Sequence, residues 1–259
     1  LGHKALAVNL SDLAAMGASP AWITLALTLP AADSAWLTGL ARGLGDLAAQ
    51  HNVQLIGGDT TRGPLALTLT ALGQVPHGQA LRRAGARPGD LIYVSGQLGD
   101  AALALLARQG LYVTQGEIAA LNARLDRPTP RVALGLALRG LASAAIDISD
   151  GLGSDLGHLC RASGVGATLH LDQLPRSRAV QDYITDTGDW ALPLSGGDDY
   201  ELCFTVPPAR QAEIEALAQQ LALPLTWIGL IQSGRTVQGL QPDGQLLSPL
   251  PGGFDHFTA

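Results

Sequence analysis

The chain has 259 residues and a formal net charge of −6, from 16 Lys and Arg against 22 Asp and Glu. This balance argues against a generic nucleic-acid or anionic-membrane binder, which needs a basic surface. Residues of the hydrophobic set make up 47% of the chain, enough for a sizeable core and against wholesale disorder. The two cysteines, Cys160 and Cys203, exclude a disulfide framework and suit a reducing compartment. Since no apolar run reaches about 18 residues, we expect a cytoplasmic protein without a transmembrane helix.

The first part of the chain alternates predicted helices and strands. Leu6, Leu10 and Leu13 recur at helical spacing, and Leu37, Leu40, Leu44 and Leu47 repeat that pattern. Strands are expected over 22–29, 53–56 and 65–75, the middle one buried and ended by Gly57-Gly58-Asp59. Because the chain starts inside an element, we expect an N-terminal segment to be missing from it.

A turn-rich stretch over 85–90 predicts a boundary between two domains, residues 1–84 and 85–259. Beyond it, strands are expected over 91–94, 145–148, 167–171, 201–206 and 225–231. Helices are expected up to 106 and over 114–125, 130–141, 152–162 and 208–221. This interleaving predicts an α/β or α+β protein.

Acidic residues gather in four short clusters, three of them rich in glycine. They are Asn9-Leu10-Ser11-Asp12, Gly57-Gly58-Asp59-Thr60-Thr61, Asp147-Ile148-Ser149-Asp150-Gly151 and Ser195-Gly196-Gly197-Asp198-Asp199. Each alone is explained by a solvated helix face, a turn or a helix N-cap. Together they indicate a polyphosphate site, because Mg²⁺ takes carboxylate oxygens and glycine lets backbone N–H groups approach phosphate.

The third cluster is the best candidate for a metal–phosphate shelf at the end of a strand. A strand would place Asp147 and Ser149 on one side, and the turn at Gly151 would swing Asp150 toward the same pocket. The sequence contains neither of the familiar glycine-rich nucleotide loops. Arg82 and Arg83 are the candidate phosphate-binding arginines, with a solvated surface pair as the alternative.

Four segments together resemble the thiamine-monophosphate kinase family. They are KALAVNLSDLAAMGA (4–18), LIGGDTTRG (55–63), AIDISDGLG (145–153) and LSGGDDYEL (194–202). The first is the most specific, whereas the others are shared more loosely with aminoimidazole ribonucleotide synthetase and related enzymes. The resemblance implies a two-domain α/β architecture, with an N-terminal domain that is incomplete in this chain, and a homodimer.

The resemblance also implies an activity and a set of site residues. Family members transfer the γ-phosphoryl group of ATP onto thiamine monophosphate, giving thiamine diphosphate. ATP contacts are implied for Gly58, Asp59, Arg83 and Ser149, and Mg²⁺ ligands for Asp12, Asp59, Asp147 and Asp150. Asp198 and Phe254 match residues that bind the thiamine substrate, although the family usually has Glu where this chain has Asp198. No protein nucleophile or acid–base residue is implied.

Two other functions remain open from the sequence. One is a different ATP-dependent reaction of the same superfamily, such as selenophosphate or aminoimidazole ribonucleotide synthesis. The other is a nucleotide-binding module without catalysis, because the missing N-terminal segment would carry further metal-binding acids and a substrate-binding histidine. The Asn-Leu-Ser-Asp-Leu-Ala-Ala-Met-Gly and Gly-Gly-Asp-Asp-Tyr-Glu-Leu runs favour the kinase over the first alternative, and the intact acidic clusters favour it over the second.

Overall fold

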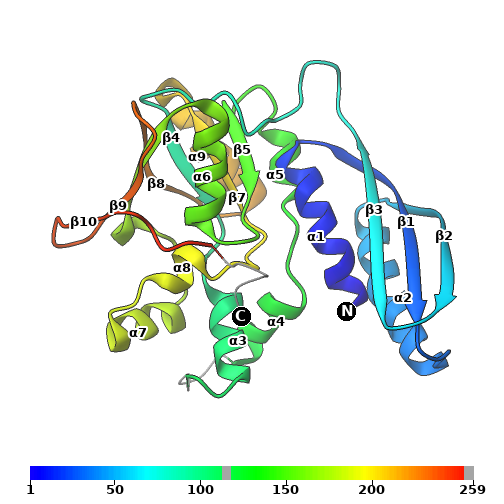
Figure 1. Ribbon diagram of the computed structural model, residues 1–259. Helices are drawn as coiled ribbons and strands as arrows, with labels where there is room; N and C mark the ends of the chain where they lie inside the picture. The colour runs from blue at the N-terminus through cyan, green and yellow to red at the C-terminus, as the bar shows by residue number, and fades with distance from the viewer. Residues whose placement is uncertain (113–117, 254–259) are drawn as a thin grey trace.

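The computed structural model describes residues 1–112 and 118–253. The chain begins with two helices and a small sheet, drawn in blue and cyan in Figure 1: α1 (Gly2–Ala15), β1 (Ser19–Leu29), α2 (Ser34–Gln50), β2 (Gln54–Arg62) and β3 (Ala66–Gln74). The strand order is β2-β1-β3, with β1 parallel to β2 and antiparallel to β3. Along β1, Ile23, Leu27 and Leu29 are buried on the side of α1 and α2. Trp22 and Ala26 face the other side and are exposed.

A second, larger sheet carries most of the remaining chain. Its strand order is β10-β9-β6-β8-β4-β7-β5, and the neighbours pair antiparallel except β6 and β9. The strands are β4 (Leu91–Ser95), β5 (Ala144–Asp147), β6 (Gly166–His170), β7 (Leu202–Val206), β8 (Leu225–Gln232), β9 (Val237–Leu240) and β10 (Leu246–Leu247). The helices are α3 (Asp100–Arg108), α4 (Ile118–Asp126), α5 (Val132–Ala137), α6 (Leu152–Ser163), α7 (Arg178–Thr187), α8 (Ala191–Ser195) and α9 (Gln211–Leu221). Short 3₁₀ turns occupy Leu171–Gln173 and Pro208–Arg210.

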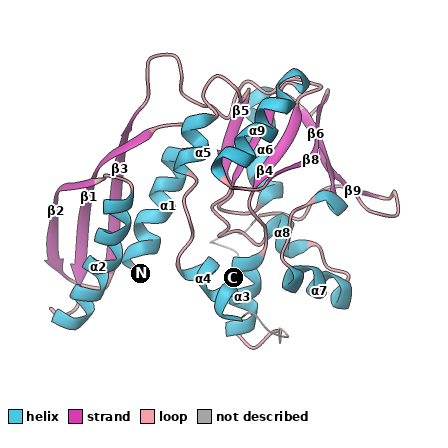
Figure 2. Cartoon of the chain, turned by 180° about the vertical axis from the view of Figure 1, so that it is seen from behind, coloured by secondary structure: helices cyan, strands magenta, loops and turns pink. Residues whose placement is uncertain are grey.

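Both faces of the larger sheet are buried, because alternate residues of its central strands enter different cores. On β4, Ile92 and Val94 pack with α6, whereas Tyr93 packs with α1 and α9. The Tyr93 and Phe204 rings stack with centroids 5.7 Å apart. Helix α1 therefore lies between the two sheets and belongs to a core that both parts of the chain share, as both views show (Figures 1 and 2).

The mixed α/β class is confirmed, and most predicted elements are present within a few residues of their expected ends. The boundary between residues 84 and 85 stays a prediction, although it falls in the irregular segment between β3 and β4. None of the helices in the described part of the chain is long and apolar enough to cross a bilayer.

The prediction for the strand at 53–56 was wrong in two respects. Strand β2 continues through Gly57-Gly58-Asp59 to Arg62, and all of its residues are exposed. A Cβ atom on Gly58 would lie 1.9 Å from the carbonyl oxygen of Leu25. The glycine is therefore needed for the close approach of β2 to β1, and not for a turn.

Other differences lie at the ends of elements and among short ones. Helix α5 covers Val132–Ala137 rather than 130–141, because the chain turns at 138–142 with Gly140 in the left-handed region. The start of the helix expected over 114–125 lies partly outside the described residues, and α4 is described from Ile118. Helices α7 and α8 and strands β9 and β10 were not predicted. The elements α8, β9 and β10 are too short to carry periodicity, whereas the ten-residue α7 is amphipathic and its pattern was missed.

We expect the packing of α1 against α5 to be sensitive to a single methyl group. A Cβ on Gly135 would lie 2.1 Å from the carbonyl oxygen of Ala14, so Gly135→Ala should push the helices apart and cost about 1–3 kcal/mol of stability. The matched control is Gly39→Ala in α2, where an added Cβ meets nothing within 4 Å. That change should raise stability by about 0.5–1 kcal/mol. Urea denaturation measures both, and equal effects of the two variants would contradict the close packing.

Candidate active site

The predicted site begins where α1 meets the end of β5. Asp147 is the last residue of β5, and its side chain is almost completely buried. Its Oδ2 accepts a hydrogen bond of 2.8 Å from the hydroxyl of Ser11 on α1. This bond joins two of the predicted acidic clusters, because Asp12 is the next residue of the helix.

Two carboxylates and one guanidinium influence each other at this point. Burial, with a smaller contribution from the nearby Asp12 carboxylate, raises the pKa of Asp147 to about 6, although the Ser11 hydrogen bond and Arg83 oppose the rise. Loss of surrounding water also raises the pKa of Asp12, and Arg83 opposes that change. The structure therefore brings Asp12, Asp147 and Arg83 within electrostatic range of one another, and their roles toward metal and ATP stay predictions.

The turn after β5 is held by an acid that the sequence analysis missed. Asp155, in the first turn of α6, is buried, and its Oδ2 accepts hydrogen bonds from the backbone N–H groups of Ser149 (3.0 Å) and Asp150 (3.1 Å). Burial, with smaller contributions from the Asp150 and Asp147 charges, raises the pKa of Asp155 to about 7, although the two backbone hydrogen bonds oppose the rise. An acid in the first turn of a helix is the sequence signal that would have found it.

The same turn corrects one geometric expectation. Strand β5 ends at Asp147, so the alternation of a strand does not extend to Ser149. Asp147 bonds to α1, whereas Ser149 and Asp150 line a separate pocket.

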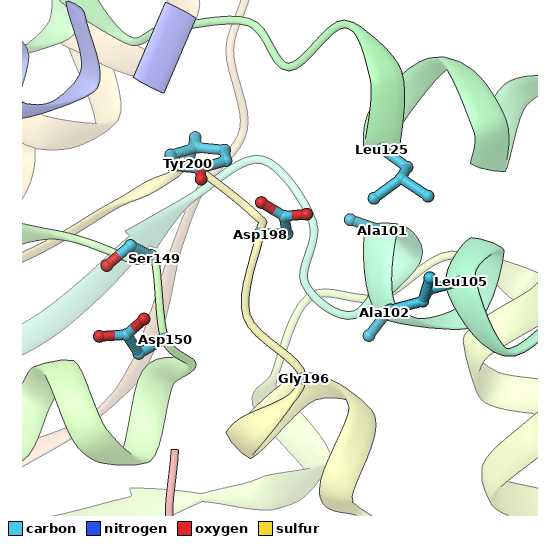
Figure 3. A pocket seen from close by; sticks show the side chains of 9 residues that line it. All are labelled: Ala101, Ala102, Leu105, Leu125, Ser149, Asp150, Gly196, Asp198 and Tyr200. Atoms are coloured by element: carbon cyan, nitrogen blue, oxygen red, sulfur yellow. The ribbon is translucent and has the colours of Figure 1, made fainter. Parts of the chain in front are cut away.

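This pocket has a volume of about 180 Å³ and lies between two polar segments and two helices. Ser149 and Asp150 form one side, and Asp198 and Tyr200 project from the loop before β7 (Figure 3). The apolar side consists of Ala101, Ala102 and Leu105 of α3 and Leu125 of α4. Two predicted clusters, about fifty residues apart in the chain, therefore line one cavity.

Asp198 is fixed by α1 and by its own backbone. Its Oδ2 accepts a hydrogen bond of 2.6 Å from Nζ of Lys4, in a partly exposed ion pair. Asp198 (φ 63°) and Tyr200 (φ 50°) both adopt the left-handed region, which is uncommon for residues other than glycine. Burial and the adjacent Asp198 carboxylate raise the pKa of Tyr200. Lys4 and Tyr200 were not predicted, although Lys4 is the one lysine of the chain.

Gly58 and Asp59 lie elsewhere in the structure. They belong to the exposed edge strand β2, which both views place on the far side of the small sheet from β5 (Figures 1 and 2). The Asp59 carboxylate accepts a hydrogen bond of 2.8 Å from the backbone N–H of Thr60. Their roles toward ATP and metal stay predictions, and Phe254 lies outside the described residues.

In the described residues, too few acids come together to form a complete set of metal ligands. Within residues 1–112 and 118–253, no three His, Cys, Asp or Glu side chains are arranged to hold an ion. Asp12 and Asp147 nevertheless fit Mg²⁺, because this ion usually takes one or two carboxylates and completes its shell with waters and phosphate oxygens. The two carboxylates repel each other, and a divalent cation between them would relieve this repulsion.

Comparisons with known proteins place the chain in a family. The family models "AIR synthase related protein, N-terminal domain" and "AIR synthase related protein, C-terminal domain" match residues 1–75 and 87–239. Thiamine-monophosphate kinase of Salmonella typhimurium is 51% identical over 262 residues, covering 100% of this chain and 80% of the relative. The chain belongs to the thiamine-monophosphate kinase family.

Solved structures of thiamine-monophosphate kinases have the same fold. The enzyme from Stenotrophomonas maltophilia superposes with a TM-score of 0.87 at 52% identity, over 94% of this chain and 78% of that one. A structure described as AaThiL complexed with AMPPCP and TMP gives a TM-score of 0.85 at 30% identity, over 99% and 80%. The two-domain architecture implied by the resemblance is therefore confirmed.

The raised pKa values at the turn predict a pH dependence of stability. Each acid binds its proton more tightly in the folded chain than at its ordinary pKa of 3.8. Each protonated acid therefore adds to the free energy of unfolding. This contribution is complete below about pH 4 and is lost as the pH rises through about 6 for Asp147 and about 7 for Asp155. Asp155→Asn keeps an oxygen that accepts both backbone hydrogen bonds but removes one titrating group. Between pH 4 and pH 8, the free energy of unfolding of this variant should therefore fall less than that of the wild type. Urea denaturation in the presence of a chelator measures this, and parallel pH curves would contradict the assignment.

Proposed function

We propose that this chain transfers the γ-phosphoryl group of ATP directly to the phosphate of thiamine monophosphate, giving thiamine diphosphate. The observation that carries the proposal is that the Asp-Ile-Ser-Asp-Gly turn and the Gly-Gly-Asp-Asp-Tyr loop line one pocket beside Asp147. Support comes from the relative complexed with AMPPCP and TMP, which has the same fold over nearly all of this chain.

Both reactants are polyanions, so the site must above all neutralise charge and align the groups. The acceptor phosphate oxygen attacks the γ-phosphorus in line through a loose transition state, which needs no protein nucleophile. We assign Mg²⁺ binding to Asp12, Asp147 and Asp150, with Asp59 as a further ligand from β2. When bound, Mg²⁺ would supply positive charge to the phosphate oxygens as the bond to the leaving group breaks.

The chain's own residues would bind and orient ATP. Arg83 presents a guanidinium beside the acids, a group that can grip phosphate with two parallel bonds. Ser149 lines the pocket with its hydroxyl, next to Asp150. Gly58 and Asp59 are proposed as further nucleotide contacts because they match the family motif.

The pocket itself suits the thiamine group. Its apolar wall on α3 and α4 would pack against the planar rings, and the Asp198 carboxylate would face the cationic ring. Lys4 neutralises part of the Asp198 charge and holds its side chain in place. Phe254 is proposed as an aromatic contact beside the thiamine.

We also assign a homodimer and a cytoplasmic location to the protein. One face of the small sheet carries Trp22 and Leu72, both exposed, among small alanine and threonine side chains, which favours contact with a second copy. Cys160 and Cys203 are both buried and free, as expected in a reducing compartment. Neither nucleic acid nor membrane is a proposed partner.

The test of the proposed function is product formation by the complete gene product. It is incubated with ATP, Mg²⁺ and thiamine monophosphate, and thiamine diphosphate is measured by mass spectrometry. One ADP released per thiamine diphosphate supports the kinase. ATP binding without thiamine diphosphate would overturn the assignment and point to another substrate of the superfamily or to a non-catalytic module.

Asp147 should be essential for turnover. Asp147→Asn keeps the shape of the side chain and an acceptor for Ser11 but removes the charge that binds Mg²⁺. We expect turnover to fall at least about 100-fold, equivalent to about 2.7 kcal/mol. Asp243→Asn, in an exposed turn, is the matched control and should leave turnover unchanged. Wild-type turnover of Asp147→Asn at saturating Mg²⁺ would exclude this role.

Asp198 should act on the thiamine substrate rather than on ATP. Asp198→Ala removes the carboxylate that faces the pocket, so the KM for thiamine monophosphate should rise while the KM for ATP stays unchanged. Steady-state kinetics with each substrate varied in turn measure the two constants. If the KM for ATP alone changed, Asp198 would belong to the nucleotide site.

A further inference from the structure

Glu201, the residue after Tyr200, is completely buried and yet fully hydrogen-bonded. Its Oε2 accepts hydrogen bonds of 2.6 Å from the hydroxyl of Ser95 and from Nε of Arg131. Its Oε1 accepts hydrogen bonds from Nη2 of Arg124 (2.7 Å) and from Nη2 of Arg131. The carboxylate therefore joins β4, α4 and the segment before α5 to the start of β7.

A second acid, Asp199, lies beside this cluster. It is also buried, and its Oδ1 accepts a hydrogen bond of 2.9 Å from the backbone N–H of Gly99, just before α3. Burial raises the pKa of Asp199, and the Arg124 guanidinium opposes that rise. Arg124 thus faces both Glu201 and Asp199, whereas Arg131 pairs with Glu201, so the Glu201 carboxylate is compensated by two guanidinium groups.

The loop alternates residues that face the pocket with residues that anchor it. Asp198 and Tyr200 line the pocket, whereas Asp199 and Glu201 point into the protein toward α3 and α4. The backbone N–H groups of Asp198 and Tyr200 bond to the carbonyl oxygens of Ser149 and Ile148, 2.8 Å away in each case. The two sets of bonds hold the loop in place between the turn after β5 and the helices.

Arg124 connects this cluster with the opposite wall of the pocket. It directly precedes Leu125, the α4 side chain that lines the cavity across from Asp198 (Figure 3). The Arg124–Glu201 bond consequently sets the spacing between the wall that would pack on the rings and the loop that carries the acid. A buried ion pair contributes little net stability compared with apolar packing, but it fixes one geometry.

We propose that Glu201, through Arg124 and Arg131, is a positioning residue that sets the width of the acceptor pocket and the orientation of Asp198. This inference rests on the proposed function of the pocket, because it assigns the same cavity to the thiamine substrate. Its consequence is that loosening the cluster weakens acceptor binding and leaves ATP binding intact.

The test uses Arg124→Gln, because the Arg124 side chain is 25% exposed and its loss leaves Arg131 on the buried carboxylate. In the complete gene product we expect the KM for thiamine monophosphate to rise about tenfold, with the KM for ATP unchanged. The dissociation constant of thiamine monophosphate, measured by calorimetry without ATP, should rise by the same factor. Arg124→Lys keeps one charged donor and should restore part of the affinity.

Arg108→Gln is the matched control. Arg108 also joins α3 to α4, through a hydrogen bond of 2.9 Å to Asp126, but this pair is exposed and does not touch Glu201. Its loss should leave both KM values unchanged.

The outcomes separate this proposal from the proposed function. Absence of thiamine diphosphate with the wild-type protein refutes the function itself. An active wild type with an unchanged KM and dissociation constant for thiamine monophosphate in Arg124→Gln overturns the positioning role. A lower melting temperature together with equal changes in the KM for thiamine monophosphate and the KM for ATP also overturns it, because such a result shows a general loss of structure. If Arg124→Gln does not fold, Arg124→Met replaces it, because it keeps the aliphatic packing and removes the bond to Glu201, and wild-type affinity of this variant for thiamine monophosphate overturns the positioning role.

Discussion

The burial of α1 between two sheets is the constraint on which the site geometry depends. Leu6 and Leu10 are fully buried in the core that both sheets share, and burying each such side chain is worth about 1.5–3 kcal/mol. Lys4 and Ser11 are seven residues apart and lie on one side of the helix, where they bond to Asp198 and Asp147. A single amphipathic helix therefore places polar groups at both the acid cluster and the pocket.

Buried carboxylates also determine the geometry of the site. Asp147, Asp155, Asp199 and Glu201 are all removed from water, which would be costly without hydrogen-bond donors. The donors come from different sources: a serine for Asp147, backbone N–H groups for Asp155 and Asp199, and two arginines with a serine for Glu201. Two of these buried acids hold a loop next to an acid that lines the pocket. Asp155 does this for Asp150, and Glu201 for Asp198.

The sequence analysis predicted the participants of the site better than their arrangement. It identified Asp12, Arg83, Asp147, Ser149, Asp150 and Asp198, which the structure gathers around α1, the turn after β5 and the loop before β7. It placed Asp59 in a turn after a buried strand, whereas β2 is an exposed edge strand that runs through that position. It missed Lys4 and Glu201, because a lysine on a helix and an acid beside hydrophobic residues have no local signal for a partner far away in the chain. It also missed Asp155, although the place of this acid in the first turn of α6 is a local signal.

The sequence by itself determined the class of the fold, because hydrophobic periodicity is a local property of each segment. It also determined the family, because the order and spacing of its glycine-flanked acids resemble those of thiamine-monophosphate kinases, one of which is 51% identical to this chain. The tertiary structure alone decided which of these acids meet. Ser11 and Asp147 are 136 positions apart, and Lys4 and Asp198 are 194 positions apart. Contacts over such separations depend on how α1 packs between the sheets, and no local pattern specifies that packing.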